Sequence, residues 1–322
     1  MMLSASRKPT HLAIHAPPAH AAFRPRILCA SDLSSKSEHA IARALQLCEA
    51  LAGRALLLHV ISNNVPLRLA GRRADRAQDA LQWHARQFAH LNVKPELSVR
   101  IGPTHATIAR AAQSWGADLV VLGLHRERPA NELTWSTAER IAHRVRRPVL
   151  VINTEAKRDY SAVTFVAGRD TSLGVQLADQ YDLFSAAHLS IVPFLPLKER
   201  GTLALARWIE SRDAARAKEL RTSVDRSVQQ AIEDAGLHRM GVELIGGHTT
   251  PRALMARIRK GKRPQLLVAG LSRNPLRLRS LARLSALSAL RTRVCDVLVF
   301  PEASARGTLH APAFTAQSVA GT

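Results

Sequence analysis

The strongest constraint on the fold of this chain is an internal repeat. The segment His105–Arg126 returns as Pro251–Arg273, and Arg147–Ile152 returns as Cys295–Phe300. Matched segments lie about 145 residues apart, which is the length of one α/β domain and far longer than a solenoid unit. The 322 residues are enough for two such domains, each with its own core. We therefore predict that the chain folds as two related domains.

Buried strands alternate with amphipathic helices along the first copy. A capping box, Ser35–Glu38, opens a helix whose apolar residues recur at helical spacing, and the helix ends at Gly53. The next helix has its own apolar face, formed by Ala77, Leu81, His84, Phe88 and Leu91. Strands apolar on both faces are typical of a parallel sheet covered by helices. The expected strands are 27–30, 55–61, 97–101, 119–123 and 148–152.

The second copy repeats this order of elements. Its longest expected helix has an apolar stripe of Leu220, Val224, Val228 and Ile232. Its expected strands lie near 163–168, 188–194, 241–246, 265–270 and 296–300. We predict the following organisation: a disordered tail over 1–25, a first domain over 26–153, a charged linker over 154–161, a second domain over 162–301 and a disordered tail over 302–322.

Composition narrows the class of protein. The net charge is +21 and the isoelectric point about 11.4, but the arginines are dispersed and aromatic residues make up only 4%. Few rings are therefore present for base stacking, and nucleic acid is not the expected partner. Trp83 and Trp208 fall on expected helices, and we expect them to be packing residues rather than binding platforms. No apolar run reaches the ~18 residues of a membrane span, and no secretory signal opens the chain. Three cysteines without a CxxC pair read as buried thiols of a cytoplasmic protein.

Several motifs of the first copy resemble the universal stress protein family. They occur in order and at the right spacing: Ile27–Ser34, Leu57–Val60, Ala117–Gly123, Ser136–Ile141 and Arg147–Val151. The second copy is similar but weaker, in Asp170–Ser172, Leu266–Gly270 and Asp296–Val299. The resemblance implies a nucleotide-binding α/β fold with a five-stranded parallel sheet in the order 3-2-1-4-5 in each domain. It also implies pseudo-dimer packing of the two domains, with a homodimer as a further level of assembly.

The resemblance implies a stress-response protein that acts through protein partners and is not an enzyme. It also implies a candidate ATP site in the first domain only. Some members of the family bind ATP through Gly-x2-Gly-x9-Gly-Ser/Thr after the fourth strand, because glycines and a helix N-terminus bring backbone N–H groups to phosphate. The corresponding residues here are Asp32, Val60, Gly123, Arg126, Ser136 and Thr137.

This loop departs from the pattern of the family. Arg126 replaces the second glycine, and the third glycine is replaced by Trp135 or Ser136, depending on the alignment. Two interpretations stay open: Arg126 provides a charge-assisted contact to phosphate, or Arg126 and Trp135 fill the site. Ser136–Glu139 also fits a helix-capping box, and Asp32 fits a turn residue. The second copy keeps Asp170 and Gly270 but has Arg273, Arg283 and Leu284 at the later positions, so no nucleotide is expected there.

Other chemistry finds little support. The chain has no P-loop, no Gly-x-Gly-x-x-Gly after a first strand and no metal-ligand spacing. We expect His59 to be a hydrogen-bonded core residue, and His105 and His125 to border the ligand edge without a catalytic partner. Two alternatives remain: a weak ATP hydrolase that uses Asp32, Gly123 and Ser136, and a basic scaffold for RNA or DNA.

Overall fold

The computed structural model describes two continuous stretches of the first half and shorter segments of the second. The described residues are 24–63, 67–123, 137–155, 160–167, 188–193, 242–244, 265–271 and 295–301, together with the single positions 181, 183, 222, 226 and 233. The predicted tails lie almost wholly outside these residues, as do much of the predicted linker and the apolar stripe 220–232.

The first half contains five parallel strands and four helices in alternation. The strands are β1 (Arg26–Ser31), β2 (Arg54–Ile61), β3 (Glu96–Ile101), β4 (Leu119–Gly123) and β5 (Val149–Ile152). They lie in the sheet in the order β3-β2-β1-β4-β5, and each neighbouring pair is parallel. The α/β class and this strand order are confirmed.

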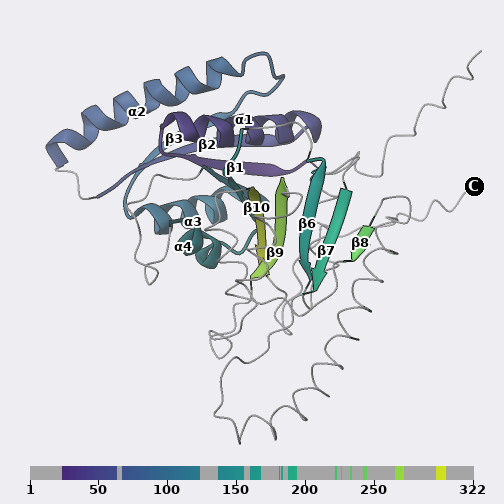
Figure 1. The fold of residues 1–322 in the computed structure, drawn as a ribbon. Helices are drawn as coiled ribbons and strands as arrows, with labels where there is room; N and C mark the ends of the chain where they lie inside the picture. Colours follow the sequence, from purple (N-terminus) through teal and green to yellow (C-terminus); the bar gives the residue numbers. More distant parts are fainter. Residues whose placement is uncertain are drawn as a thin grey trace, which may run out of the picture.

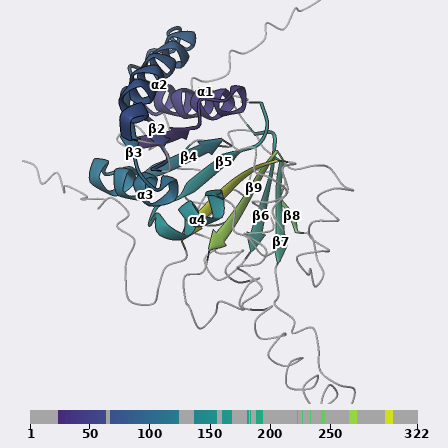
Figure 2. The same cartoon turned by 90° about the vertical axis from the view of Figure 1, so that its left-hand side faces the viewer.

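The four helices cover both faces of the sheet. On one face lie α1 (Ser35–Ala50) and α2 (Leu67–Gln87), and on the other lie α3 (Thr104–Trp115) and α4 (Thr137–Arg144) (Figures 1 and 2). Alternate residues of each strand enter different cores, because successive side chains of a strand point to opposite faces. Ile27 and Cys29 join the core beneath α1, whereas Leu28 joins the core beneath α3 and α4. This is why the strands are apolar on both faces.

The second half adds five more strands to the same sheet. They are β6 (Ala162–Ala167), β7 (His188–Pro193), β8 (Val242–Leu244), β9 (Leu266–Leu271) and β10 (Asp296–Pro301), close to the predicted positions. Their spatial order, β8-β7-β6-β9-β10, repeats the order of the first five. Every pair among them is parallel.

One antiparallel contact joins the two sets of strands. β10 pairs with β5, with Val297 opposite Val151 and Val299 opposite Val149, so the ten strands form a single sheet. The sequence predicted two five-stranded sheets and did not predict this junction. Both hydrophobic cores continue through it, from Leu150 to Leu298 on one face and from Val151 to Val297 on the other.

The ends of α1 differ in part from the prediction. The N-cap is Ser34, which makes no side-chain capping bond, so the predicted capping box Ser35–Glu38 is wrong. The Ser34 hydroxyl instead donates a hydrogen bond to the carboxylate of Asp32 at 2.6 Å, and this bond competes with a capping contact to the helix. At the C-terminus the helix ends at Ala50, three residues before the predicted Gly53, and the left-handed residue is Ala52 with a φ of 48°. The Gly53 N–H donates to the Cys48 carbonyl at 2.8 Å.

The three cysteines are buried and reduced among the described residues, as expected. Burial raises the pKa of Cys48 to about 12 and raises the pKa of Cys29 even further. These thiols are therefore protonated packing groups rather than nucleophiles.

A buried polar cluster joins the segments on either side of the predicted linker. Asp296, at the start of β10, accepts hydrogen bonds from the backbone N–H groups of Asn153 and Thr154 at 2.7 and 3.0 Å. Its other oxygen accepts the Tyr160 hydroxyl at 2.6 Å. The guanidinium of Arg43, from α1, lies 4.6 Å from the centre of the Tyr160 ring. The cluster therefore connects the end of β5, the approach to β6, the start of β10 and α1.

The cluster predicts an order of stability among variants. Asp296→Ala removes the acceptor of several buried donors, so we expect it to lower the free energy of unfolding by about 3 kcal/mol or more. Tyr160→Phe removes one donor and should cost about 1 kcal/mol. Denaturant unfolding of the purified variants measures both. Equal losses in the two variants would contradict the central place of Asp296.

Two glycines provide a matched test of backbone packing. A Cβ on Gly53 would lie 2.5 Å from the Pro25 carbonyl oxygen, whereas a Cβ on Gly71, within α2, would meet nothing within 4 Å. We expect Gly53→Ala to destabilise the protein by about 1–3 kcal/mol, because backbone must move. Gly71→Ala should stabilise it by about 0.5–1 kcal/mol through helix propensity. Thermal unfolding measures both, and a neutral Gly53→Ala would refute the close approach.

Candidate functional site

The carboxyl ends of β1 and β4 form the point where the chain changes direction in the first half. β1 pairs with β2 on one side and with β4 on the other, with Ala30 beside Leu122 and Ser31 beside His59. Open α/β sheets bind ligands at such a switch point, outside the carboxyl ends of the strands. This register brings Asp32, Val60 and Gly123 to one edge of the sheet, as the resemblance implied.

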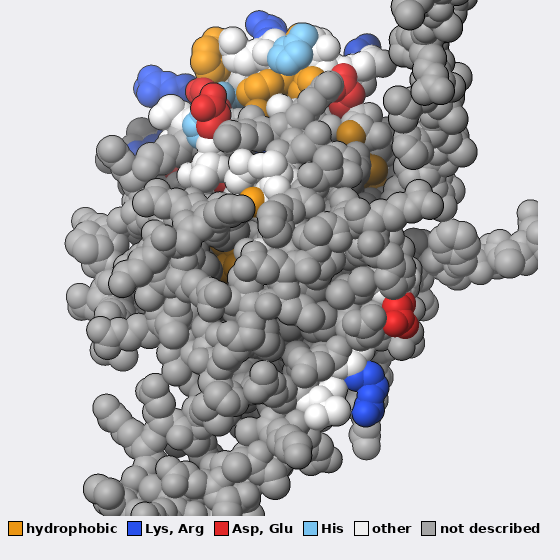
Figure 3. All heavy atoms as spheres, turned by 45° about the vertical axis from the view of Figure 1, so that its right-hand side comes forward, with side chains coloured by type: hydrophobic (Ala, Val, Ile, Leu, Met, Phe, Trp, Pro, Cys, Tyr) orange, Lys and Arg blue, Asp and Glu red, His pale blue; other side chains and the backbone are white. Residues whose placement is uncertain are grey.

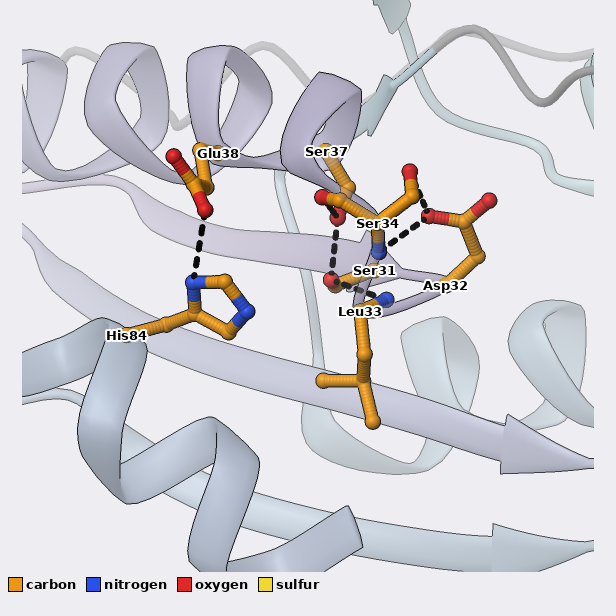
Figure 4. Close-up of polar contacts among 7 residues, drawn as sticks. All are labelled: Ser31, Asp32, Leu33, Ser34, Ser37, Glu38 and His84. Atoms are coloured by element: carbon orange, nitrogen blue, oxygen red, sulfur yellow. Dashed lines mark hydrogen bonds and ion pairs between the residues drawn. The ribbon is translucent and has the colours of Figure 1, made fainter.

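Asp32 lies exposed directly after β1 and shapes the turn into α1. Its Oδ1 atom accepts the Ser34 N–H at 3.0 Å and the Ser34 hydroxyl at 2.6 Å (Figure 4). These bonds orient the carboxylate. The turn interpretation of Asp32 is therefore confirmed, and the same bonds hold an acidic side chain at this edge of the sheet.

The turn contains a strained residue and a relay of hydroxyl groups. Leu33 has a φ of 63°, in the left-handed region that bulky side chains avoid. Its N–H donates to Ser31 Oγ at 3.0 Å, and Ser31 Oγ lies 2.8 Å from Ser37 Oγ (Figure 4). Since the Ser37 hydroxyl donates to the Ser34 carbonyl at 2.7 Å, the Ser31 hydroxyl is the donor to Ser37. The strained turn is thus fixed to the first turn of α1.

Gly123 has a packing reason for being a glycine. A Cβ at this position would lie 3.0 Å from the Cα atom of Ser37 and 3.5 Å from the Cβ atom of Ala40. A side chain would therefore push α1 away from β4. The retained glycine therefore serves the contact between helix and sheet.

His59 and Val60 are the last two residues of β2 before its final residue, Ile61. Val60 is half-buried and in register with Arg100 of β3. His59 Nδ1 lies 2.9 Å from the Ser31 carbonyl oxygen, which confirms the locally hydrogen-bonded imidazole. His59 therefore links β1 and β2 just below the edge.

The remaining predicted site residues lie outside the described positions or at their limit. Thr137 is the first residue of α4, and because α4 follows β4, its N-terminal end lies toward the carboxyl edge. Arg126, Trp135, Ser136 and His125 lie outside the described residues. The capping box Ser136–Glu139 and both interpretations of Arg126 stay predictions.

His105 lies at the start of α3, where the carboxyl end of β3 leads into the helix. Partial burial and the positive charges of Arg144 and Arg140 lower the pKa of His105. The lowered pKa favours the neutral imidazole. Its neighbours of α4, rather than His105 itself, provide positive charge on this side of the sheet.

Sequence reasoning missed the polar pair beside the turn. His84 of α2 is buried, and its Nδ1 atom faces Glu38 Oε1 of α1 at 3.7 Å (Figure 4). His84 was assigned to an apolar face, which is where it lies, and Glu38 was assigned to the capping box. The sequence pattern of each helix does not show that His84 and Glu38, which lie on different helices, face each other in the fold.

The edge of the second half faces the other way. β6 lies between β7 and β9, so β6 and β9 form a second switch point, and Gly270 lies near the end of β9. Because β10 is antiparallel to β5, the carboxyl ends of these strands lie at the opposite edge of the sheet from Asp32. Asp170, Arg273, Arg283 and Leu284 lie outside the described residues.

Within the described parts of the chain, no three His, Cys, Asp or Glu side chains come together as a metal site. The helices of those parts include none that is both long and apolar enough to cross a bilayer.

Comparisons with known proteins agree with this geometry. Residues 24–153 match the model of the universal stress protein family. Among curated proteins, none matches this sequence. A universal stress protein from Archaeoglobus fulgidus has a similar structure, with a TM-score of 0.59 and 15% identity over 86% of this chain and 96% of that one.

Two proteins from Pseudomonas aeruginosa also share the fold. A protein of unknown function has a TM-score of 0.55 and 17% identity, over 88% of this chain and 94% of that one. A protein described as a universal stress protein has a TM-score of 0.54 and 17% identity, over 88% of this chain and 95% of that one. At these identities the likeness concerns the fold alone. The family match shows that residues 24–153 belong to the universal stress protein family.

Proposed function

We propose that this protein binds ATP at the carboxyl edge between β1 and β4 and acts as a non-enzymatic stress-response protein through protein partners. The observation that carries the proposal is the position of Asp32, an oriented and exposed carboxylate at the switch point beside Gly123. A carboxylate at this position suits the hydroxyl groups of a ribose.

In the proposed complex the phosphates of ATP lie beside the end of β4 and the start of α4. Gly123 ends β4 at this edge of the sheet, and the N-terminal end of α4 favours negative charge. Arg126, Ser136 and Thr137 complete the proposed site, with Arg126 in place of backbone donors. Val60 would border the base from β2.

We further propose that residues 162–301 are a second, degenerate domain of the same family that binds no nucleotide. The repeated strand order β8-β7-β6-β9-β10 supports the relation, and the arginines in place of glycines support the loss of binding. The chain then forms its own pseudo-dimer through β5 and β10, and homodimers would be built on that unit. We also propose a cytoplasmic location, which the free, buried thiols support.

Isothermal titration of the full-length protein with Mg·ATP tests the site. We expect at most one nucleotide per chain, and Asp32→Ala should weaken binding about tenfold or more, because a charge-assisted hydrogen bond is lost. Asp75→Ala, on the exposed face of α2, is the control of equal charge. Ser34→Ala removes the partner of Asp32 in the turn and keeps the carboxylate.

The outcomes separate the alternatives. No heat of binding at millimolar ATP, or an equal loss in Asp32→Ala and Asp75→Ala, would overturn the proposed site. Two nucleotides per chain would overturn the proposal for the second half. Analysis of the same samples for ADP tests the absence of turnover, because sustained ADP release that depends on Asp32 would make the protein an ATP hydrolase.

A further inference from the structure

The solvent face of α2 has a stripe of arginines around one exposed tryptophan. The helix uses its apolar face against the sheet, where Ala77, Leu81 and His84 are buried. Residues spaced by three or four on the other side share one face. These are the α2 stripe: Arg72, Arg76, Asp79, Trp83 and Arg86, all exposed.

Trp83 is the unexpected member of the stripe. The sequence assigned it to packing, but 53% of its surface is exposed, so that prediction is wrong. The reason is helical phase, since Trp83 lies about 100° from the buried His84 and about 160° from the buried Leu81 around the helix. The ring of His84 lies edge-on to the indole, with 4.9 Å between the ring centres, and helps to fix its orientation.

The stripe keeps a net positive charge. Its three arginines face Asp79 and the adjoining Asp75, which is also exposed. Among the described residues, no ion pair joins either aspartate to these arginines. The stripe extends about 21 Å from Arg72 to Arg86 at 1.5 Å per residue. Figure 3 shows basic side chains, with a few acidic ones, on the part of the surface that the described helices form at the top of the molecule.

We propose that the α2 stripe binds single-stranded nucleic acid, with Trp83 stacking on a base and the flanking arginines contacting phosphates. Such binding combines basic residues that follow the backbone with aromatic rings that stack on bases. A membrane is a poorer match, because a helix that lies on a bilayer inserts its apolar face and here that face is covered by the sheet. The net charge of +21 favours a polyanion in general and the exposed ring favours one with bases.

Composition alone argued against nucleic acid, because the arginines are dispersed and aromatic residues are few. One exposed ring between arginines is enough for a short stacking platform. The stripe lies on the solvent-exposed side of α2 and does not include any residue of the proposed ATP site.

The test uses the full-length protein and a fluorescein-labelled oligouridylate of about 12 nucleotides, followed by fluorescence anisotropy. Trp83→Ala should weaken binding about fivefold or more, and Trp83→Phe should recover part of the affinity. Arg72→Ala/Arg76→Ala should weaken binding and reduce the slope of log K against log salt by about 1.4, or 0.7 for each phosphate contact. An oligodeoxythymidylate of equal length distinguishes RNA from DNA.

The matched control is Arg110→Ala/Arg146→Ala, which removes the same charge from exposed positions of α3 and of the turn after α4. Circular dichroism and thermal unfolding show whether each variant is folded. An equal loss in the two double variants, or no effect of Trp83→Ala, would overturn the proposal in favour of diffuse charge attraction. Absence of binding would also overturn it, as would Trp83-dependent binding only to phosphatidylserine vesicles or to polyglutamate.

Discussion

The antiparallel pairing of β5 with β10 is the contact on which the rest of the structure depends. Each set of five parallel strands ends on one side at a strand that is apolar on both faces, and such a strand cannot be left as an open edge without exposing unpaired backbone groups and apolar surface. Here β5 and β10 pair with each other, with Leu150 opposite Leu298, so neither strand is left as an open edge. Both cores then extend across the junction.

The direction of this pairing determines where ligands can bind. Antiparallel strands place the two switch points at opposite edges of one sheet, so the two halves cannot share one nucleotide. The edge beside Asp32 keeps an oriented carboxylate and a glycine packed closely against α1. Asp296, by contrast, accepts hydrogen bonds from Asn153, Thr154 and Tyr160 at the junction, although burial raises its pKa. Asp32 thus lies at an exposed edge of the sheet, whereas Asp296 belongs to a buried structural contact.

The internal repeat and the apolar runs predicted the positions of the strands. Their order in the first half, and the placing of Asp32 and Gly123 at one edge of the sheet, came from the resemblance to the universal stress protein family. The apolar runs did not predict that β5 and β10 pair. A strand that is apolar on both faces has the same sequence pattern whether its neighbour comes from its own half of the chain or from the other half. The helix start was missed by one residue because Ser34 and Ser35 are both good capping residues and only the geometry shows that Asp32 takes the Ser34 hydroxyl. Trp83 was misplaced because it adjoins the buried His84 in sequence, while its phase on the helix turns it to solvent.

The central claim is that the junction makes the two halves one cooperative unit. Native-state hydrogen exchange measures this directly, because it gives the free energy of opening at each backbone amide. We expect the slowest amides of β5 and β10 to open with the same free energy as those of β1 and β4, within about 1 kcal/mol. Exchange of β9 and β10 through an opening several kcal/mol lower, while β1 and β4 stay protected, would show that the two halves open independently.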